Sequence, residues 1–158
     1  MKLFDRLGKL RDRRRPYCTM IVPAAGESRR MGGGNKLLLP LEGEPVLAHT
    51  LRAIDAATLV DEIILSTRTE CLAEMAELCR RCGLQKPVRV VVGGETRTHS
   101  VLAAALEANE KARLIAVHDG ARPLIRPEQI DELIRFGERT YAAAPVSYTH
   151  LTLPTNSR

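Results

Sequence analysis

Residues 22–36 read VPAAGESRRMGGGNK, and this stretch decides how the rest of the chain is interpreted. It follows the apolar run MIV at 20–22, which predicts a buried strand. Small residues let a backbone approach a ligand and turn its N–H groups inward, while Arg29, Arg30 and Lys36 supply positive charge. The stretch matches neither G-x-x-x-x-G-K-[ST] nor G-x-G-x-x-G. We therefore expect a loop that follows a strand and wraps the triphosphate of a nucleotide.

Outward from this loop, apolar runs and helical patterns alternate along the chain. Strands are predicted at residues 18–22, 60–67, 88–92 and 114–117, and a further strand at 142–146. Helices are predicted at residues 46–54, 70–81, 100–108 and 127–136, with glycines at 83 and 137 ending two of them. Such alternation is typical of βαβ units. The sequence therefore predicts an α/β fold with a Rossmann-like, doubly wound, mainly parallel sheet covered on both faces.

Positive charge is concentrated at the N-terminus. The 158-residue chain has a formal net charge of +5, and its 44% hydrophobic content suits one domain with a single core. Residues 1–15 hold seven Lys or Arg against Asp5 and Asp12, so the remaining basic and acidic residues balance. We expect a basic extension at 1–16, either a short amphipathic helix or a solvated segment, and a domain at 17–146 that does not bind nucleic acid. Residues 147–158 are expected to be a non-native or disordered tail, which leaves the sheet incomplete on its C-terminal side.

Neither a membrane segment nor an export signal is expected. No apolar run approaches the ~20 residues that a membrane helix needs, and no apolar region follows the basic N-terminal residues. The expected compartment is the cytoplasm, where Cys18, Cys71, Cys79 and Cys82 would be reduced thiols. Cys79 and Cys82 have C-x-x-C spacing, but they close a helical pattern and lack further ligands at zinc spacing. We therefore expect no metal or redox role for this pair.

Three loops of unusual composition follow predicted strands. They are residues 23–36, 93–100 (GGETRTHS) and 118–123 (HDGARP). Open parallel sheets bind ligands beyond the carboxyl ends of their strands, so the three loops should meet at one site. Arg30 and Lys36 are candidates for stabilising a phosphoryl group under attack, and Asp119 is the candidate Mg²⁺ ligand. Gly94 would permit close approach to a base, which Ser100 would hydrogen-bond.

The motifs in and around these loops resemble one family. They are VPAAG at 22–26, RM at 30–31 with Lys36, PVLAHTL at 45–51, GGxxRxxSV at 93–101 and HDGARP at 118–123. In order, spacing and context they are similar to the 2-C-methyl-D-erythritol 4-phosphate cytidylyltransferases, over about residues 18–146. The resemblance implies a fold of the nucleotide-diphospho-sugar transferase type. It also implies transfer of a cytidylyl group from CTP to methylerythritol phosphate, with release of pyrophosphate, in non-mevalonate isoprenoid synthesis, by a protein that is a homodimer at full length.

The resemblance further implies roles for individual residues. In the first loop, backbone groups of Ala24, Ala25 and Gly26 would contact the nucleotide, and Arg30 and Lys36 would stabilise the pentacoordinate α-phosphate. No general base is required, because the acceptor phosphate already bears a nucleophilic oxygen. Catalysis would then consist of positioning and charge neutralisation during in-line displacement.

The other two loops also carry roles by resemblance. Cytosine would be recognised by residues of the second loop, Gly94, Glu95 and Ser100, with Arg97 supporting that loop. In the third loop, Asp119 would face Mg²⁺ and the ribose, Gly120 would belong to the same nucleotide-binding segment, and Arg122 would brace it.

Some features depart from the family pattern and leave alternatives open. Ser28 stands where many members have Gly, and residues 35–37 read NKL instead of a more usual PKQ. The family continues past residue 146 with a projecting dimer arm and a later Arg and Lys that hold methylerythritol phosphate. One alternative is a related transferase acting on ribitol 5-phosphate or the molybdenum cofactor, the latter disfavoured by the second and third loops. Another is a nucleotide-binding remnant without turnover.

Simpler roles also stay open for single residues. Arg97 would pair with Glu95 on the surface, a contact worth little. His49 and His118 would be ordinary packed or capping histidines. Of the adjacent arginines at 29 and 30, the first is the better candidate for a solvated side chain.

Overall fold

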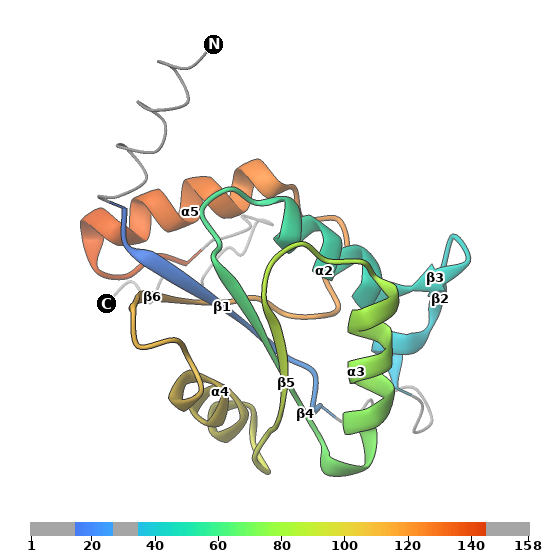
Figure 1. Ribbon diagram of the computed structural model, residues 1–158. Coiled ribbons are helices and arrows are strands. Elements are labelled where there is room, and N and C mark those ends of the chain that lie inside the picture. Colours follow the sequence, from blue (N-terminus) through green and yellow to red (C-terminus); the bar gives the residue numbers. More distant parts are fainter. Residues whose placement is uncertain (1–14, 27–34, 145–158) are drawn as a thin grey trace, which may run out of the picture.

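The computed structural model describes residues 15–26 and 35–144, which form one parallel sheet between layers of helices (Figure 1). The strands of this sheet are β1 (Tyr17–Pro23), β4 (Glu62–Thr67), β5 (Val88–Val92) and β6 (Ala112–Val117). All pairs are parallel, and the strands lie in the order β5-β4-β1-β6. The chain moves outward from β1 to β5 and then crosses back to the other side of β1. A topological switch point therefore lies between β1 and β6, where such sheets bind ligands.

Helices cover both faces of the sheet. They are α2 (Val46–Ala56), α3 (Leu72–Arg81), α4 (Arg97–Leu106) and α5 (Pro127–Thr140). Four short elements complete the described chain: η2 (Lys36–Leu38), β2 (Pro40–Leu41), β3 (Glu44–Pro45) and η3 (Thr69–Cys71). Figure 1 shows α4 on one side of the sheet and α2, α3 and α5 on the other. The predicted doubly wound α/β fold class is confirmed.

Alternate residues of the central strand β1 feed two apolar clusters. Met20 and Val22 pack with side chains of α2, α3 and α5, including Leu47 and Leu51. Ile21 packs on the opposite face, in a smaller cluster with α4. Because both faces are covered, β1 is buried along its interior and β4 along its whole length, including the polar residues Glu62, Ser66 and Thr67 at the two ends of β4. Each fully buried Leu or Ile contributes about 1.5–3 kcal/mol to folding.

The largest departures from the predicted elements lie at three places, while other boundaries shift by one or two residues. α4 begins at Arg97, three residues early, because the Thr96 hydroxyl accepts a hydrogen bond from the His99 amide at 3.1 Å. α5 does not end at Gly137 but continues to Thr140. A helical glycine costs only about 1 kcal/mol relative to alanine, so the buried side of α5 outweighs it. Residues 142–144, the described part of the predicted strand at 142–146, form no strand.

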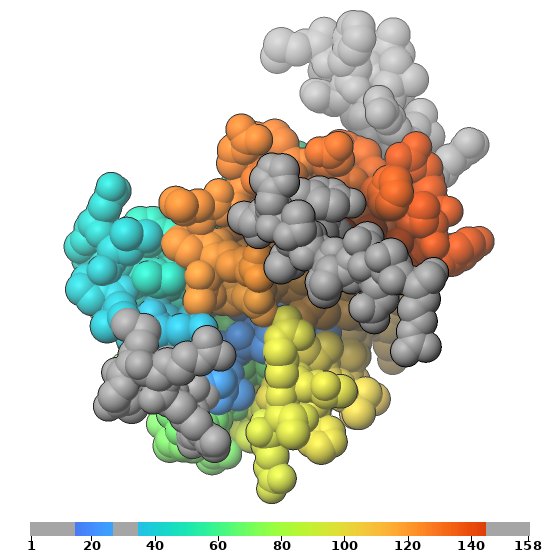
Figure 2. Space-filling model, turned by 180° about the vertical axis from the view of Figure 1, so that it is seen from behind, coloured from blue at the N-terminus to red at the C-terminus, as the bar shows by residue number. Residues whose placement is uncertain are grey.

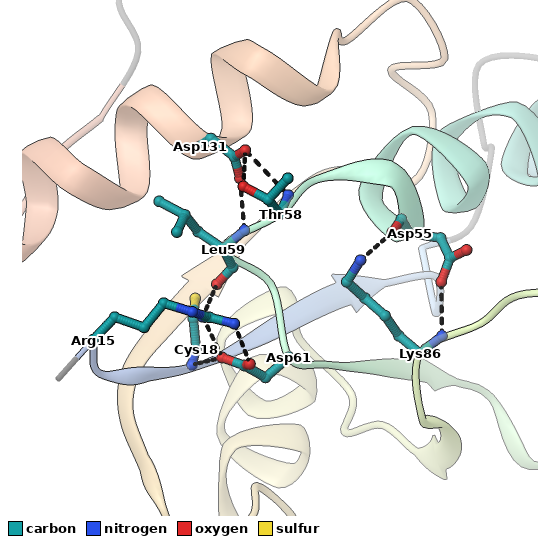
Figure 3. Close-up of polar contacts among 8 residues, drawn as sticks. All are labelled: Arg15, Cys18, Asp55, Thr58, Leu59, Asp61, Lys86 and Asp131. Carbon is teal, nitrogen blue, oxygen red and sulfur yellow. Dashed lines mark hydrogen bonds and ion pairs between the residues drawn. The ribbon is translucent and has the colours of Figure 1, made fainter. Parts of the chain in front are cut away.

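One carboxylate attaches α5 to the rest of the domain (Figure 3). Asp131 is 7% exposed and accepts from the Thr58 amide at 3.0 Å, the Thr58 hydroxyl at 2.6 Å and the Leu59 amide at 2.8 Å. These donors belong to the turn between α2 and β4. Asp131 therefore holds the last helix against a segment about 70 residues earlier in the chain.

Two further carboxylates in Figure 3 fix the ends of strands. Asp61 accepts from the Cys18 amide at 2.8 Å and from both terminal nitrogens of Arg15, at 2.9 and 2.7 Å. Asp55 accepts from the Lys86 amide at 2.9 Å, just before β5. Both contacts lie at the edge of the sheet where the strands begin. They therefore stabilise the sheet from the edge opposite to the carboxyl ends of the strands.

The described cysteines are free thiols, and burial of the C-x-x-C pair disfavours redox chemistry at that pair. Cys79 lies in the last turn of α3 and Cys82 caps it, as the sequence predicted. Burial raises the pKa of Cys79 to about 11 and also raises the pKa of Cys82. Reactive C-x-x-C pairs need lowered thiol pKa values, so this environment works in the opposite direction.

Several expectations fall on residues that the structure does not describe. Most of the basic extension at 1–16 and the whole tail at 147–158 lie outside the described residues, as do Ser28, Arg29 and Arg30. Among the described helices, none has the length and apolar character needed to cross a membrane.

Candidate active site

A cleft of about 780 Å³ lies at the carboxyl ends of the four strands. In Figure 2 the blue end of β1 is visible in a hollow between yellow atoms of the segment entering α4 and orange atoms of the segment after β6. The described residues that line the cleft are Pro23, Ala24, Ala25, Gly26, Lys36, Leu37, Arg68, Gly94, Glu95, Thr96, Arg97, Ser100, Asp119, Gly120, Ala121 and Arg122. The structure therefore brings together every predicted site residue except Arg30, which lies outside the described residues.

The first loop is fixed to the sheet by its backbone. The Ala24 amide donates to the Ser66 carbonyl at 2.7 Å, which continues the β1–β4 ladder past the end of β1. Lys36 lies beyond the undescribed segment, at the start of η2, and the Asn35 side chain accepts from the Leu37 amide at 3.1 Å. This cap fixes the start of η2, and Lys36 lines the same cleft as Gly26.

The second loop is closely packed against the start of α4. The Ser100 hydroxyl donates to the Gly94 carbonyl at 3.0 Å, and Ser100 is 1% exposed. A Cβ on Gly94 would lie 2.4 Å from the Cβ of His99, and one on Gly93 would lie 2.7 Å from the Ser100 oxygen. Both glycines are therefore required by packing inside the loop itself, a reason independent of any ligand.

The third loop presents a carboxylate held by two arginines. Asp119 accepts from Arg97 at 2.7 Å and from Arg122 at 3.3 Å, one guanidinium on each oxygen. The hydrogen bond from Arg97, with the positive charges of both arginines, lowers the pKa of Asp119 despite its partial burial. Arg97 thus pairs with Asp119 and not with Glu95, so the expected surface pair is wrong.

Gly120 anchors the same loop to α2. Its carbonyl accepts from the buried Thr50 hydroxyl at 2.8 Å, and a Cβ there would lie 3.0 Å from Leu47. A side chain at this position would press into the core beneath the cleft. The absence of a side chain at Gly120 therefore lets the third loop pack directly on α2, below the cleft.

His49 and His118 have structural surroundings. A ring nitrogen of His49 lies 2.9 Å from the carbonyl of Leu41 in β2, so His49 is a packed structural histidine, one of the two roles expected. Burial lowers the pKa of His118, and its amide donates to the Ile21 carbonyl at 2.9 Å, extending the β1–β6 ladder. The Nδ1 atom of His118 is buried and has no hydrogen-bond partner among the described residues.

The described residues offer little for a protein-built metal cage. Within residues 15–26 and 35–144, no three His, Cys, Asp or Glu side chains are grouped to hold an ion. The cleft contains two carboxylates, Glu95 and Asp119. Mg²⁺ in nucleotide sites usually takes one or two carboxylates together with phosphate oxygens and water, so this donor set fits a nucleotide-borne ion.

Sequence reasoning missed Arg68, which also lines the cleft. It follows Thr67, the last residue of β4, and precedes η3. Its loop has no glycine and no recognisable motif. The sequence feature that could have identified Arg68 is its position, because it is a basic residue directly after a predicted parallel strand.

A family model described as IspD, 2-C-methyl-D-erythritol 4-phosphate cytidylyltransferase, matches residues 18–152. The enzyme of that name from Halalkalibacterium halodurans is 35% identical over 126 residues, which cover 79% of this chain and 55% of the relative. The enzyme from Bacillus pumilus is 40% identical over 120 residues, covering 75% of this chain and 52% of the relative. The chain spans about half the length of the curated relatives that it matches.

Two solved structures are similar to the chain in fold. The 4-diphosphocytidyl-2C-methyl-D-erythritol synthase of Anaerococcus prevotii superposes with a TM-score of 0.66 at 26% identity, covering 77% of this chain and 50% of that chain. A Mycobacterium tuberculosis protein solved with manganese gives a TM-score of 0.58 at 25% identity, covering 78% of this chain and 61% of that chain. The chain belongs to the 2-C-methyl-D-erythritol 4-phosphate cytidylyltransferase family.

Proposed function

We propose that the cleft binds CTP and that the protein transfers its cytidylyl group to 2-C-methyl-D-erythritol 4-phosphate, releasing pyrophosphate. The observation that carries this proposal is the convergence of three loops on one cleft at the switch point of the sheet. Each loop contains a motif of the family to which the chain belongs. We also propose Mg²⁺ as the metal, a cytoplasmic location and a homodimer for the full-length protein.

The nucleotide would lie across the backbone of the first two loops. Ala24, Ala25 and Gly26 would present backbone groups to the ribose and phosphates, since small side chains there leave the main chain accessible. The cytosine would lie near Gly94 and Ser100. The Ser100 proton is used by the Gly94 carbonyl, so its oxygen would accept from the amino group of the base. Glu95 would supply a second acceptor at the rim.

Charge at the α-phosphate would be stabilised by Lys36 and by Arg30, which lies outside the described residues. Such preorganised donors are each worth roughly 10²–10³ in rate, or about 3–4 kcal/mol. Asp119 would face the ribose and the metal, with Arg97 and Arg122 positioning its carboxylate. When bound, Mg²⁺ would neutralise part of the triphosphate charge.

The reaction needs no general base from this chain. An oxygen of the acceptor phosphate attacks the α-phosphorus and forms the new P–O bond, while the bond to the β-phosphate oxygen breaks and pyrophosphate leaves. The acceptor oxygen is already anionic, so no proton has to be removed. The protein's contribution is positioning and stabilisation of charge on the in-line transition state.

Two alternative functions compete with this proposal. A related cytidylyltransferase acting on ribitol 5-phosphate would use the same CTP cleft. A nucleotide-binding protein without turnover is the other, because the chain spans about half the length of its curated relatives. We further propose residues 17–146 as the nucleotide-binding domain, with the basic extension 1–16 and the tail 147–158 outside it.

Pyrophosphate release from CTP tests the proposal. Release with methylerythritol phosphate, and much slower release with ribitol 5-phosphate, is the expected result. The reverse preference would favour the ribitol enzyme. CTP binding without release in the presence of either acceptor would favour the protein without turnover.

A further inference from the structure

Arg68 lies between the two backbone segments that the first two loops contribute to the cleft. The two residues before it each accept a hydrogen bond from a neighbouring loop. Ala24 donates to the Ser66 carbonyl and Gly93 donates to the Thr67 carbonyl, both at 2.7 Å. These bonds extend the sheet by one residue on each side of β4. Arg68 is therefore the first residue after β4, directly beyond the two residues that hydrogen-bond the first and second loops.

The first and second loops touch each other next to this point. A Cβ built on Gly93 would lie 3.4 Å from the Cβ of Ala25, which is ordinary contact distance. The side chain of Arg68 lines the cleft together with Ala25 and Gly94. A nucleotide that lies across both loops would thus pass within reach of a long side chain that starts from the end of β4.

The charges in the cleft favour an anionic ligand near Arg68. The described lining residues with formal charge are Lys36, Arg68, Arg97 and Arg122 against Glu95 and Asp119. Arg97 and Arg122 both contact Asp119, so their charges are partly compensated on the β6 side. Arg68 adds a positive charge on the β4 side of the cleft.

Two contacts of the Arg68 guanidinium come from residues close to it in the chain. It lies 3.3 Å from a carboxylate oxygen of Glu70 and 3.9 Å from the sulfur of Cys71. The side chains of Arg68 and Glu70 are 40% and 65% exposed. Ion pairs this exposed contribute little, so exchange of Glu70 for a ligand oxyanion has a small cost.

We propose that Arg68 is a nucleotide-binding residue whose guanidinium donates to a phosphate oxygen of CTP. This assignment rests on the proposed CTP-binding function and adds a contact from β4, the strand whose loop carries no family motif. A planar guanidinium can donate two parallel hydrogen bonds to phosphate oxygens, which also neutralise its positive charge. An uncharged nucleobase in the same place would leave the charge of the guanidinium without a counter-charge. The contact therefore adds affinity for the phosphates and not for the nucleoside.

Calorimetric titration of the 158-residue chain with cytidine, CMP, CDP and CTP, in Mg²⁺, tests this. Arg68→Met should weaken CTP binding about 10-fold, in line with the loss of one charged hydrogen bond, and leave cytidine binding unchanged. Arg68→Lys should restore part of the affinity because it keeps the charge. Arg81→Met is the matched control, since it removes an arginine from the far end of α3, and should bind CTP like the wild type.

The outcomes separate this proposal from the function on which it rests. A wild-type chain that binds no CTP overturns both. Wild-type binding with equal CTP affinity in Arg68→Met overturns the Arg68 assignment alone. Equal losses for cytidine and CTP would mean a contact with the base or ribose, and would also overturn it. Thermal unfolding of Arg68→Met and Arg68→Lys verifies that both variants are folded.

Discussion

Arg97 and Asp119 form an ion pair across the cleft, with 2.7 Å between the guanidinium nitrogen and the carboxylate oxygen. The pair joins the first residue of α4 to the loop after β6, although 22 positions separate the two residues in the chain. It therefore couples the loop proposed to recognise cytosine to the carboxylate proposed to face the metal. Movement of either loop would change the geometry of this hydrogen bond.

Removing Arg97 should raise the pKa of Asp119. Its ordinary value is 3.8, and the hydrogen bond from Arg97 is the main cause of its lowered value. The contribution of the ionised carboxylate to stability is present above pH 3.8 and is lost as the pH falls through the lowered pKa. Side-chain carboxyl NMR should give a midpoint below 3.8 in the wild type and a higher one in Arg97→Met. An unchanged midpoint in the variant would contradict this account.

A methyl group on Gly94 should distort the second loop. Its Cβ would lie 2.4 Å from the Cβ of His99, so α4 or the loop has to shift. We expect Gly94→Ala to lose about 1–3 kcal/mol of unfolding free energy in urea titrations and to weaken CTP binding.

Gly137→Ala is the matched control for Gly94→Ala. Its nearest atom would be 3.7 Å away, and it lies inside α5. Alanine is favoured there by about 0.5–1 kcal/mol, so this variant should be more stable than the wild type. Destabilisation by both substitutions to the same degree would mean that loop packing is not the cause.

The sequence was sufficient to predict the sheet because its strands are apolar and short, and because glycine-rich loops follow two of them. The strand at 88–92 has the predicted bounds. The contacts between distant residues were not predictable. The Arg97–Asp119 pair and the hydrogen bonds of Asp131 depend on the exact positions that distant helices and loops take when they pack together. Hydrophobic periodicity and short motifs in the sequence do not contain this information. Arg68 was missed for the same reason, since its importance comes from the neighbouring strands and not from its own loop.

Asp131 should contribute strongly to stability. In Asp131→Ala, the Thr58 hydroxyl and the amides of Thr58 and Leu59 lose their acceptor. We expect the unfolding free energy to fall by about 2–3 kcal/mol. Glu132→Ala removes an exposed carboxylate from the adjacent position of α5 and should change stability by about 0.5 kcal/mol or less. Equal effects of the two substitutions would show that the Asp131 clamp is energetically unimportant.

Lys36 should act mainly in the transition state. Lys36→Ala in the full-length protein should lower the rate of pyrophosphate release by about 10²–10³, while CTP affinity falls much less. Lys111→Ala is a suitable control, because Lys111 lies just before β6 begins, at the opposite edge of the sheet. Turnover that is unchanged in Lys36→Ala would remove this residue from the proposed mechanism.

The location of the CTP site is the central claim, and amide chemical-shift mapping tests it most directly. On addition of CTP and Mg²⁺ to the isotope-labelled chain, we expect the largest shifts at Ala25, Gly94 and Asp119, which line the cleft at the carboxyl edge. Asn109 and Lys111, in a second pocket at the opposite edge of the sheet, should be unaffected. Absence of shifts at the carboxyl edge, or shifts confined to the opposite edge, would contradict the account.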